Sequence, residues 1–346
     1  MKNFESMGLR HIGGKLWALD QQLLPDREEW IECQNPDQMI QAIRALKVRG
    51  APLIGVAAAA SLAKYVEAGH PASKVLEAAR ALRAARPTAV NLMAAIDRMM
   101  PDTTNFDPAR LVREAETIFD EDVELCQRMG TLGANLVRHG ESILTHCNAG
   151  GLATVGIGTA VGVIRKAHDQ GKKIHVYVDE TRPLLQGGRL TAWELEKAEI
   201  PYTLICDNMA AYLMAQGKIQ RAFVGSDRIA LNGDFANKIG TYSLAVNARF
   251  HGVPLHPVAP YTTIDFRCES GEGIPIEMRE EEEVRGAFGS FGRVRWAPAK
   301  AKTYNPSFDV TPVALVESMV LDRGVYSRAE LQAGGLKKLR AELGFN

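Results

Sequence analysis

The sequence has 346 residues, of which 46% are hydrophobic and 24% charged, a composition typical of soluble globular proteins and a length sufficient for two domains. Lysines and arginines number 41, as do aspartates and glutamates, so the balance excludes a general electrostatic attraction to nucleic acid or to anionic membranes. We therefore expect no nucleic-acid partner and no membrane partner. Any anion-binding site must be local.

The N-terminus, MKNFESMGLRHIGGKLW, has no apolar stretch flanked by basic residues and does not resemble a signal peptide. Charged residues interrupt every apolar run before it reaches the roughly 18 to 20 residues that span a bilayer. The five cysteines are odd in number and include no C-x-x-C pair, which indicates neither a disulfide framework nor a zinc knuckle. We expect a cytoplasmic protein with free thiols and no metal.

Residues 1–125 are rich in helix signals and are predicted to form a smaller, mainly helical N-terminal domain that contributes to the substrate site. Asn35-Pro36-Asp37 opens the first helical pattern and Pro52 opens the second. Further helical patterns follow over 73–86, 91–100 and 111–138. The last of these comes after a turn-rich break and could link two domains.

From Glu141 onward, short apolar runs alternate with segments of helical length. The runs predict strands over 143–147, 174–179, 202–207, 222–227 and 254–260. The segments between them predict helices over 153–169, 190–199, 208–217 and 239–251. Strands that are buried on both faces and joined by crossover helices form a doubly wound parallel sheet. We therefore expect an α/β fold, in which residues 126–346 form a Rossmann-like catalytic domain.

Ligands of such sheets bind beyond the carboxyl ends of the strands. The predicted strand ends carry chemically active side chains, namely Cys147, Asp179-Glu180, Asp207-Asn208, Asp227 and Tyr261-Thr262. A single aspartate at such a position is more often a helix cap than a functional group. Because these side chains gather at one edge of the predicted sheet, the group as a whole indicates an active site.

The motif THCNAGGLATVGIGTAVGVI places Cys147 at a strand end, followed by Gly150-Gly151 in a tight turn before a predicted helix. Cys147 is either a buried structural thiol or a reactive thiolate favoured by the dipole of that helix. Gly156-Ile157-Gly158 begins a G-x-G-x-x-x-G run that falls inside the predicted helix. A dinucleotide fingerprint instead has G-x-G-x-x-G in the turn, so we expect no cofactor.

A second motif, VGSDRIALNGDFANKIGTYSLAV, covers residues 224–246. Asp227 is predicted to end a strand, Asn232-Gly233-Asp234 to form a turn, and Asn237 and Lys238 to stand at the start of a helix. Backbone amides and a lysine at that point could hold a phosphate. The alternative is a turn followed by a helix cap. A lysine at a helix N-terminus opposes the helix dipole, and a bound anion would relieve that conflict, which favours the phosphate site.

Arginines in other loops could add paired donors to a phosphate. Arg49 precedes Gly50-Ala51-Pro52 at a predicted helix start, Arg86 lies at a helix break, and the polar loop 182–189 contains Gln186. Each arginine alone is more often a partner in a surface salt bridge. Together they make a local phosphate site plausible on a neutral protein.

A family resemblance rests on the motifs RGAPLIGVAAA, RPTAVNL, HCNAGGLATVGIGTAVGVI, VYVDETRPLLQGGRLTAWEL, DNMAAYLM, VGSDRIALNGDFANKIGTYSLAV and NPSFDVTP. In this order they resemble the methylthioribose-1-phosphate isomerases of methionine salvage over nearly the whole chain. The same superfamily includes ribose-1,5-bisphosphate isomerases and the regulatory subunits of translation initiation factor 2B.

The resemblance implies conversion of 5-methylthioribose 1-phosphate to 5-methylthioribulose 1-phosphate, an aldose-ketose isomerisation. It implies that Asp227 is the proton donor and Cys147 a base or a stabiliser of the transition state. Contacts to the sugar-phosphate substrate would come from Arg49, Gly50, Ala51, Arg86, Gln186, Asn237 and Lys238. A homodimer is implied by the resemblance alone.

Alternative functions remain at this point. An isomerase of 5-deoxyribose 1-phosphate or ribose 1,5-bisphosphate would use the same chemistry, and the loops CNAGG, FRCESGEGIPIE and WAPAKAKTYNPSFDVTP depart from the family pattern. These departures leave the 5-substituent of the sugar open. A non-catalytic regulatory subunit could dispense with Cys147 and Asp227, yet both are present. A nicotinamide-dependent dehydrogenase is disfavoured by the glycine spacing.

Overall fold

The computed structural model describes residues 1–86 and 90–344 and divides the chain into two compact units. Unit 1 contains Met1–Cys126 and Gly151–Gly158, and unit 2 contains Gln127–Gly150 and the chain from Thr159 onward. The chain first leaves unit 1 after Cys126. It then returns to unit 1 for eight residues, from Gly151 to Gly158, which the sequence analysis did not anticipate. Within the described residues, we find no helix with the length and apolar character to cross a membrane.

Unit 1 begins with an antiparallel sheet that the prediction of a mainly helical segment missed. Its strands lie in chain order: β1 (Phe4–Glu5), β2 (Leu9–Ile12), β3 (Lys15–Leu19) and β4 (Trp30–Glu32). Gly13 and Gly14, with φ of 58° and 74°, form the turn between β2 and β3. The glycine pair follows β2, in which every second residue is buried. Alternation followed by two glycines is typical of a hairpin, so this hairpin could have been predicted from the sequence.

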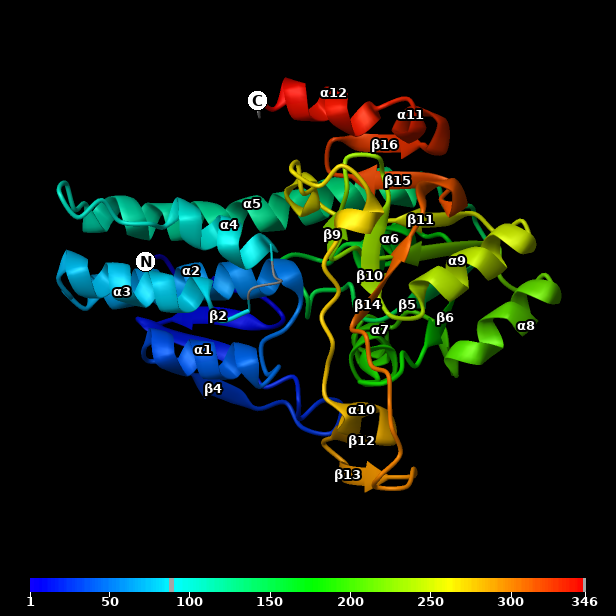
Figure 1. The fold of residues 1–346 in the computed structure, drawn as a ribbon, viewed down its shortest axis with the longest axis horizontal. Helices are drawn as coiled ribbons and strands as arrows, with labels where there is room; N and C mark the ends of the chain where they lie inside the picture. Colours follow the sequence, from blue (N-terminus) through cyan, green and yellow to red (C-terminus); the bar gives the residue numbers. More distant parts are fainter. Residues whose placement is uncertain (87–89, 345–346) are drawn as a thin grey trace. The chain divides into compact units, whose positions relative to one another are not determined.

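The helices of unit 1 follow the sheet as predicted: α1 (Pro36–Arg44), α2 (Ala51–Glu67), α3 (Ala72–Arg83), α4 (Val90–Arg98) and α5 (Pro108–Ala134). Asn35 caps α1, because its side chain accepts a hydrogen bond from the backbone N–H of Gln38. Figure 1 shows α1 to α4 grouped with the sheet in unit 1. Helix α2 is buried along most of its length, and its alanines let neighbouring helices approach closely. Helix α5 contributes residues to both units.

The central sheet of unit 2 has five parallel strands in the order β11-β8-β5-β6-β7, which confirms the doubly wound prediction. The strands are β5 (Ser142–His146), β6 (His175–Asp179), β7 (Tyr202–Ile205), β8 (Arg221–Val224) and β11 (Leu255–Pro257). The chain proceeds from β5 to β6 and β7 in one direction and from β8 to β11 in the other. The switch point of the sheet therefore lies between β5 and β8.

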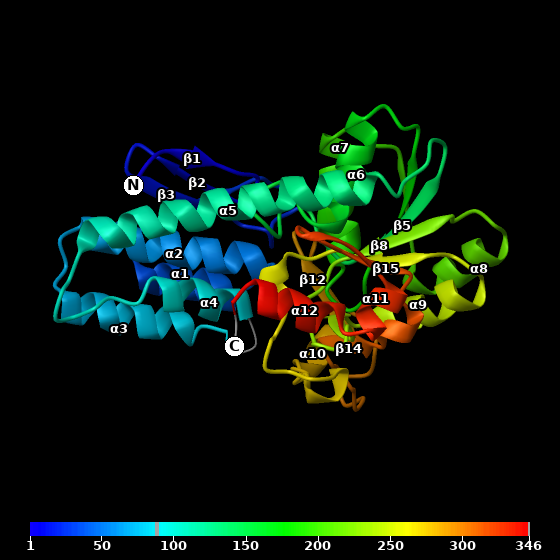
Figure 2. The same ribbon diagram turned by 90° about the horizontal axis from the view of Figure 1, so that it is seen from above.

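The crossover helices cover both faces of this sheet. Figure 2 shows α6 (Ala160–Asp169) and α7 (Ala192–Lys197) on one side, and α8 (Ala210–Ala215) and α9 (Thr241–Phe250) on the other. The π-helix η1 (Gly187–Thr191) runs into α7, and the 3₁₀ turn η2 (Asp207–Met209) runs into α8. The predicted helices over 190–199, 208–217 and 239–251 are thus confirmed with small shifts at their ends.

The helix predicted over 153–169 is correct only from Ala160 onward. Residues 151–159 form turns and bends instead, and Gly158 has a φ of 95° that disfavours helix. The glycines of the G-x-G run therefore lie before the helix and not inside it. Gly156 packs against Cys126 of α5, where a Cβ would lie 3.0 Å from the Cys126 sulfur, so this glycine serves packing.

The remaining strands of unit 2 form small sheets around the main one. A three-stranded sheet joins β9 (Arg228–Ile229), β10 (Phe235–Lys238) and β14 (Phe308–Thr311), with β10 in the middle. Two hairpins pair β12 (Gly286–Gly289) with β13 (Gly292–Arg295), and β15 (Ser318–Leu321) with β16 (Gly324–Ser327). The short helices between and after them are η3 (Tyr261–Thr263), η4 (Gly271–Gly273), α10 (Glu281–Arg285), η5 (Val313–Leu315), α11 (Arg328–Gln332) and α12 (Gly335–Glu342).

Candidate functional site

The carboxyl ends of β5 and β8 lie side by side at the switch point of the sheet, where His146 is in register with Val224. Cys147 directly follows β5. Strand β8 ends at Val224, so Asp227 lies in the turn before β9. The prediction that the strand over 222–227 ends at Asp227 was therefore wrong. The turn is held by the backbone N–H of Asp227, which donates to the carbonyl of Ala236 in β10 at 2.9 Å.

Gly225 brings the segments around this switch point together. A Cβ on Gly225 would lie 3.1 Å from the Cβ of Ala149 and 3.7 Å from Oδ1 of Asn237. Ala149 is two residues beyond Cys147, and Gly225 is two residues before Asp227. The three segments that carry Cys147, Asp227 and Asn237 therefore approach one another at one point of unit 2.

Cys147 is held through both of its peptide groups. Its N–H donates to Oγ1 of Thr181 at 2.7 Å, and its carbonyl accepts from Oγ1 of Thr191 at 2.6 Å. The backbone of Cys147 has a φ of 65°, in the left-handed region that residues other than glycine rarely adopt. Residues held in such conformations cluster at functional sites, where the surrounding contacts over-determine them. The Cys147 side chain is largely buried, and α6 begins only at Ala160, after the turns of unit 1.

A buried carboxylate organises the residues after Cys147. Nδ2 of Asn148 donates to Oε1 of Glu194 in α7 at 2.7 Å. The same carboxylate lies against Gly150, where any Cβ would overlap with both of its oxygens. Only glycine fits at position 150, because the Glu194 carboxylate lies so close to its backbone. This reason for the glycine was not predicted from the sequence.

Asn237 and Lys238 lie in β10 and not at the start of a helix, which corrects the prediction. Both side chains are buried, and Nζ of Lys238 donates to the carbonyl of Ser307 at 2.7 Å. Nδ2 of Asn237 donates to Oγ1 of Thr241, the first residue of α9, at 3.0 Å. A strand places the two residues on opposite faces of the small sheet, because successive side chains alternate.

The N-terminus of α9, where a phosphate was predicted, is capped by a carboxylate. The side chain of Asp309 in β14 accepts from the N–H groups of Gly240 at 2.7 Å and Tyr242 at 3.0 Å. Burial raises the pKa of Asp309, although these two amides lower it. The positive end of the helix dipole is thus already matched by a protein anion.

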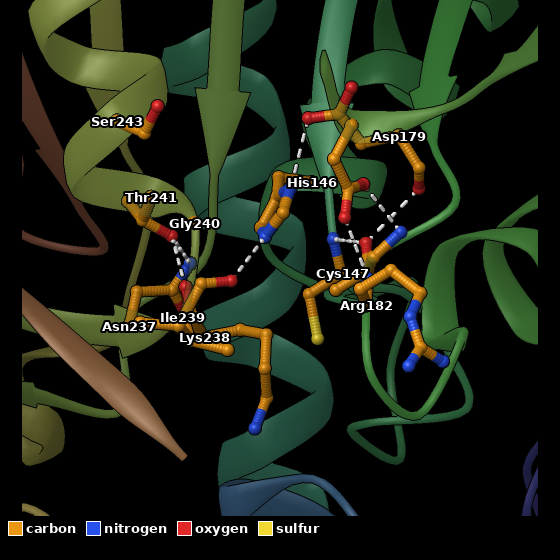
Figure 3. A network of polar contacts seen from close by, with 12 residues as sticks. His146, Cys147, Asp179, Arg182, Asn237, Lys238, Ile239, Gly240, Thr241 and Ser243 are labelled. Carbon is orange, nitrogen blue, oxygen red and sulfur yellow. Dashed lines mark hydrogen bonds and ion pairs between the residues drawn. The ribbon is translucent and has the colours of Figure 1, made fainter. Parts of the chain in front are cut away.

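A buried histidine connects the strand ends, as Figure 3 shows. Nδ1 of His146 lies 2.9 Å from Oδ2 of Asp179 at the end of β6, and Nε2 lies 3.0 Å from the carbonyl of Ile239. Burial lowers the pKa of His146, but the hydrogen bond and charge of Asp179, aided by the charge of Asp207, raise it above its ordinary value overall. Burial raises the pKa of Asp179 to about 6 against the opposing effect of His146.

His146, Asp179 and Asp207 bring three potential metal-ligand atoms within 4.8 Å of one another. Their hydrogen bonds already account for this proximity. The two carboxylate oxygens of Asp207 accept from the N–H groups of Thr181 and Arg182, both at 2.7 Å, while Asp179 and His146 bond each other. The group therefore ties the ends of β5, β6 and β7 together.

Gln186 lies in the loop after β6, immediately before η1, and is 6% exposed. Its Oε1 is buried and has no hydrogen-bond partner among the described residues. An unsatisfied buried amide oxygen is costly unless a ligand or water supplies a donor.

The other predicted binding residues lie in unit 1. Gly50 caps α2 with a φ of 91°, and a Cβ there would overlap with Ala153. The N–H of Leu53 donates to the carbonyl of Ala153 at 3.0 Å, so the Arg49-Gly50-Ala51 turn is docked on the 151–158 segment. Arg86 lies between α3 and α4, and the adjoining Pro87 and Thr88 of its motif lie outside the described residues.

Residues 47–328 match the model of the initiation factor 2 subunit family. The chain belongs to this family. A family member from Yersinia enterocolitica, named methylthioribose-1-phosphate isomerase, is 53% identical over 333 residues that cover 96% of each chain. The resemblance found from the motifs is thereby confirmed.

Two solved structures of the family superpose on nearly the whole chain. One is 5-methylthioribose 1-phosphate isomerase from Pyrococcus horikoshii OT3, with a TM-score of 0.87 and 41% identity, covering 97% of this chain and 96% of its own. The other is the translation initiation factor eIF-2B subunit delta from A. fulgidus, with a TM-score of 0.81 and 38% identity, covering 97% and 98%. The fold is therefore shared by proteins named as enzymes and as initiation-factor subunits.

Several residues that hold this candidate site together were not predicted from the sequence. Asp179 and Asp207 were noted as strand ends without a role, while His146, Thr181, Thr191 and Glu194 were not singled out. His146 carried a usable signal, because it directly precedes Cys147 at a predicted strand end. Thr181, Thr191 and Glu194 had no such signal in the sequence, because they are far from Cys147 along the chain and contact its segment only in the folded structure.

Proposed function

We propose that this protein is an aldose-ketose isomerase that converts 5-methylthioribose 1-phosphate to 5-methylthioribulose 1-phosphate in methionine salvage. The names of relatives that are about half identical over nearly the full length support this reaction. The observation that carries the proposal is the convergence of the Cys147, Asp227 and Asn237 segments at the switch point of the sheet. These segments carry a thiol, a carboxyl group and an amide, which in our proposal act on one small ligand.

The reaction must open a sugar ring whose anomeric carbon carries a phosphate, so the ring does not open freely to an aldehyde. In our mechanism the carboxyl group of Asp227 gives its proton to the ring oxygen as the bond from that oxygen to C1 breaks. The hydrogen on C2 then moves to C1, and the proton of the C2 hydroxyl returns to the Asp227 carboxylate as the ketone forms. Asp227 thus ends as it began, and the product is an isomer of the substrate.

Two routes are open for the hydrogen on C2, and they give Cys147 different tasks. In one route a Cys147 thiolate removes it as a proton, which is then delivered to C1. In the other the hydrogen shifts directly to C1 with its electron pair, and Cys147 stabilises the charge that develops. Turnover in deuterated water distinguishes them, because substantial deuterium at C1 of the product requires proton transfer through an exchanging group.

The roles of Cys147 and Asp227 lead to a direct prediction. Cys147→Ala and Asp227→Asn should each lower kcat by on the order of a hundredfold or more, because a positioned acid or base contributes that much. Both variants should remain folded, as judged by circular dichroism and thermal unfolding. A near-wild-type kcat in either variant would remove that residue from the mechanism.

The substrate is tested by offering three sugar phosphates to the purified protein: 5-methylthioribose 1-phosphate, 5-deoxyribose 1-phosphate and ribose 1,5-bisphosphate. Ketose formation is followed by NMR, and we expect the first to be converted with the highest kcat/KM. Preference for either of the others would assign the chain to the corresponding isomerase. Conversion of none would favour the regulatory role suggested by the similarity to the A. fulgidus initiation-factor subunit.

Substrate contacts are proposed for Arg49, Gly50, Ala51, Arg86, Gln186, Asn237 and Lys238. The buried and unsatisfied Oε1 of Gln186 supports its assignment, because a sugar hydroxyl can donate to it. The remaining assignments rest on the motifs. Arg49→Ala and Arg86→Ala should each raise KM more than they lower kcat if the guanidinium groups bind phosphate uniformly through the reaction.

We further propose that the protein is a cytoplasmic homodimer. The free thiols of all five cysteines suit a reducing compartment. A stripe of exposed apolar residues on α9, Tyr242, Val246 and Phe250, supports contact with another protein surface. Sedimentation velocity of the purified protein checks the dimer, and a single species with the mass of one chain would refute it.

A further inference from the structure

His146 is the most enclosed ionisable group next to the proposed reaction centre. Its side chain is 1% exposed, and that of its partner Asp179 is 3% exposed. It directly precedes Cys147 in the chain. A Cβ on Gly240 would lie only 2.9 Å from Cε1 of the His146 ring, so the ring packs tightly against this glycine. In Figure 3 the imidazole lies between the Asp179 side and the Ile239–Gly240 side of the network.

The partners of His146 determine where its hydrogens are. The carbonyl of Ile239 can only accept, so Nε2, at 3.0 Å, carries a hydrogen. Nδ1 faces Oδ2 of Asp179 at 2.9 Å, and that contact is a hydrogen bond only when one proton lies between the two atoms. The proton belongs either to an imidazolium facing a carboxylate or to a carboxyl group facing a neutral imidazole. Both arrangements hold the same number of protons and have no net charge.

This pair connects the two sides of the proposed site. On one side, Oγ1 of Thr181 donates to the carbonyl of Asp179 at 3.0 Å and accepts from the N–H of Cys147. On the other side, Ile239 follows directly after Asn237 and Lys238 in the chain. The Ile239 N–H also donates to Ser307, whose carbonyl holds the Lys238 ammonium. A shift of the imidazole therefore moves both the Cys147 loop and the end of β10.

The charged groups around the pair favour keeping its shared proton. Asp207 acts on both members, Glu180 acts on Asp179, and Asp309 faces His146 from β14. These carboxylates make loss of the proton less favourable. Two cations belong to this environment: Lys238 acts on Asp309, and Arg182 acts on Glu180 and Asp207. Because negative groups outnumber positive ones, the pair should lose its proton at a higher pH than a free histidine does.

We propose that His146 is a positioning residue for the isomerisation, which holds the Cys147 loop and the Asn237–Lys238 strand in their working geometry through a neutral, proton-sharing pair with Asp179. The proposal rests on the isomerase function proposed above. Cys147 and Asp227 carry out the chemistry, while His146 touches neither substrate nor reacting atoms. A displacement of about 1 Å in such a site can cost on the order of a hundredfold in rate.

The kinetic test uses His146→Gln and Asp179→Asn in the full-length protein, assayed well below the unfolding temperature of each variant. Glutamine cannot satisfy both partners, so kcat should fall by on the order of tenfold to a hundredfold and KM should rise as Lys238 shifts. Asparagine can donate to Nδ1 and keep the ring in place, so its kcat should fall less. The wild-type rate should decline at high pH as the pair deprotonates, and Asp179→Asn should lack this decline.

The matched control is His256→Gln, because His256 is also a buried histidine of the central sheet but bonds Arg221 and Ser318. Its kcat should stay within about twofold of the wild type, since surface and core changes remote from a site act mainly on stability. A kcat for His146→Gln within twofold of the wild type would overturn the proposal. So would equal losses in the two histidine variants, or an unchanged alkaline decline in Asp179→Asn.

A spectroscopic measurement tests the pair without substrate. In the wild type, proton and ¹⁵N NMR should show a slowly exchanging, downfield proton on Nδ1 of His146, which disappears in Asp179→Asn and persists in His256→Gln. Absence of this proton from the wild type overturns the pair. If the wild type shows the proton but converts no sugar phosphate, the isomerase function fails while the pair stands, so the two failures are distinguishable.

Discussion

At the residue scale, the backbone around the proposed thiol is held in unfavourable conformations. Cys147, Thr181 and Leu185 have φ of 65°, 67° and 58°, and all three follow the ends of β5 and β6. Each such conformation costs on the order of 1 to 3 kcal/mol and persists only where other contacts enforce it. The threonine hydroxyls on both peptide groups of Cys147 are the contacts that do so. The thiol is therefore presented by a rigid loop.

Gly150 provides a prediction about this loop. Gly150→Ala would place a methyl group on the Glu194 carboxylate and push the loop away from α7. We expect kcat to fall at least tenfold and stability to fall by about 1 to 3 kcal/mol, the usual cost of overpacking. Gly188→Ala is the matched control, because its Cβ would meet Leu204 at an ordinary 3.7 Å. Steady-state kinetics and denaturant unfolding measure both, and a tolerated Gly150→Ala would contradict the packing argument.

His256 gives a prediction for the pH dependence of stability. Burial and then the charge of Arg221 lower its pKa to about 3, whereas an unfolded histidine titrates near 6.5. Between these values the unfolded state binds a proton that the folded state does not, so stability falls as pH falls from about 6.5 to about 3. The loss is about 5 kcal/mol across that window.

His256→Gln should remove this contribution. The free energy of unfolding, measured with urea between pH 7 and pH 4, should decline less in the variant than in the wild type. Asp122 and Asp179, whose pKa values burial raises to about 6, act in the opposite direction but equally in both proteins. Parallel pH curves for the two proteins would show that His256 does not titrate as described.

At the element scale, helix α5 holds the returning 151–158 segment through a buried carboxylate. Oδ2 of Asp122 accepts from the N–H of Val155 at 2.7 Å, and the N–H of Gly156 also contributes a hydrogen bond. The same segment supports the start of α2, because Leu53 bonds Ala153 and Gly50 packs on it. Asp122 therefore stabilises the turn that carries Arg49, Gly50 and Ala51.

Asp122→Ala should leave these buried N–H groups without their acceptor and cost about 1 to 3 kcal/mol of stability. Asp122→Asn keeps one acceptor oxygen and should cost less. Hydrogen exchange at Val155 and Gly156 should accelerate in the alanine variant. Asp120→Ala on the same helix is the control, because its exposed pair with Lys2 should contribute no more than about 1 kcal/mol. Equal effects at the two positions would contradict the role of Asp122.

At the scale of the whole molecule, unit 1 is built from two separate stretches of chain. The 151–158 segment supplies partners to Leu53, Asp122 and Gln21, the last through a hydrogen bond of 2.8 Å from Nε2 to the carbonyl of Leu152. A fragment of residues 1–126 lacks all of these partners. We expect it to unfold at a lower temperature and less cooperatively than the same fragment joined to residues 151–158 by a flexible linker. Circular dichroism melts compare the two, and identical melts would refute the expectation.

Much of this architecture could be predicted from the sequence, because its elements have local signals. The buried strands from Ser142 to Pro257 are short apolar runs, and their separation by helical lengths implies a parallel sheet. The hairpin at Gly13-Gly14 had a signal that was missed. Two features were mispredicted because tertiary contacts override local preference. The 151–159 segment is not helical because it packs against α5, and Lys238 lies in a strand because it pairs with β14.

The sequence by itself determined the fold class, the strand ends at Cys147 and near Asp227, and the family, since periodicity and motifs are properties of adjacent residues. The tertiary structure decided which groups meet. The hydrogen-bond partners of the segment around Cys147 come from different elements: Asp179 and Ile239 bond His146, Thr181 and Thr191 bond Cys147, and Glu194 bonds Asn148. Hydrogen bonds act only over about 3 Å, and such distances between remote segments are set by how the strands and helices pack.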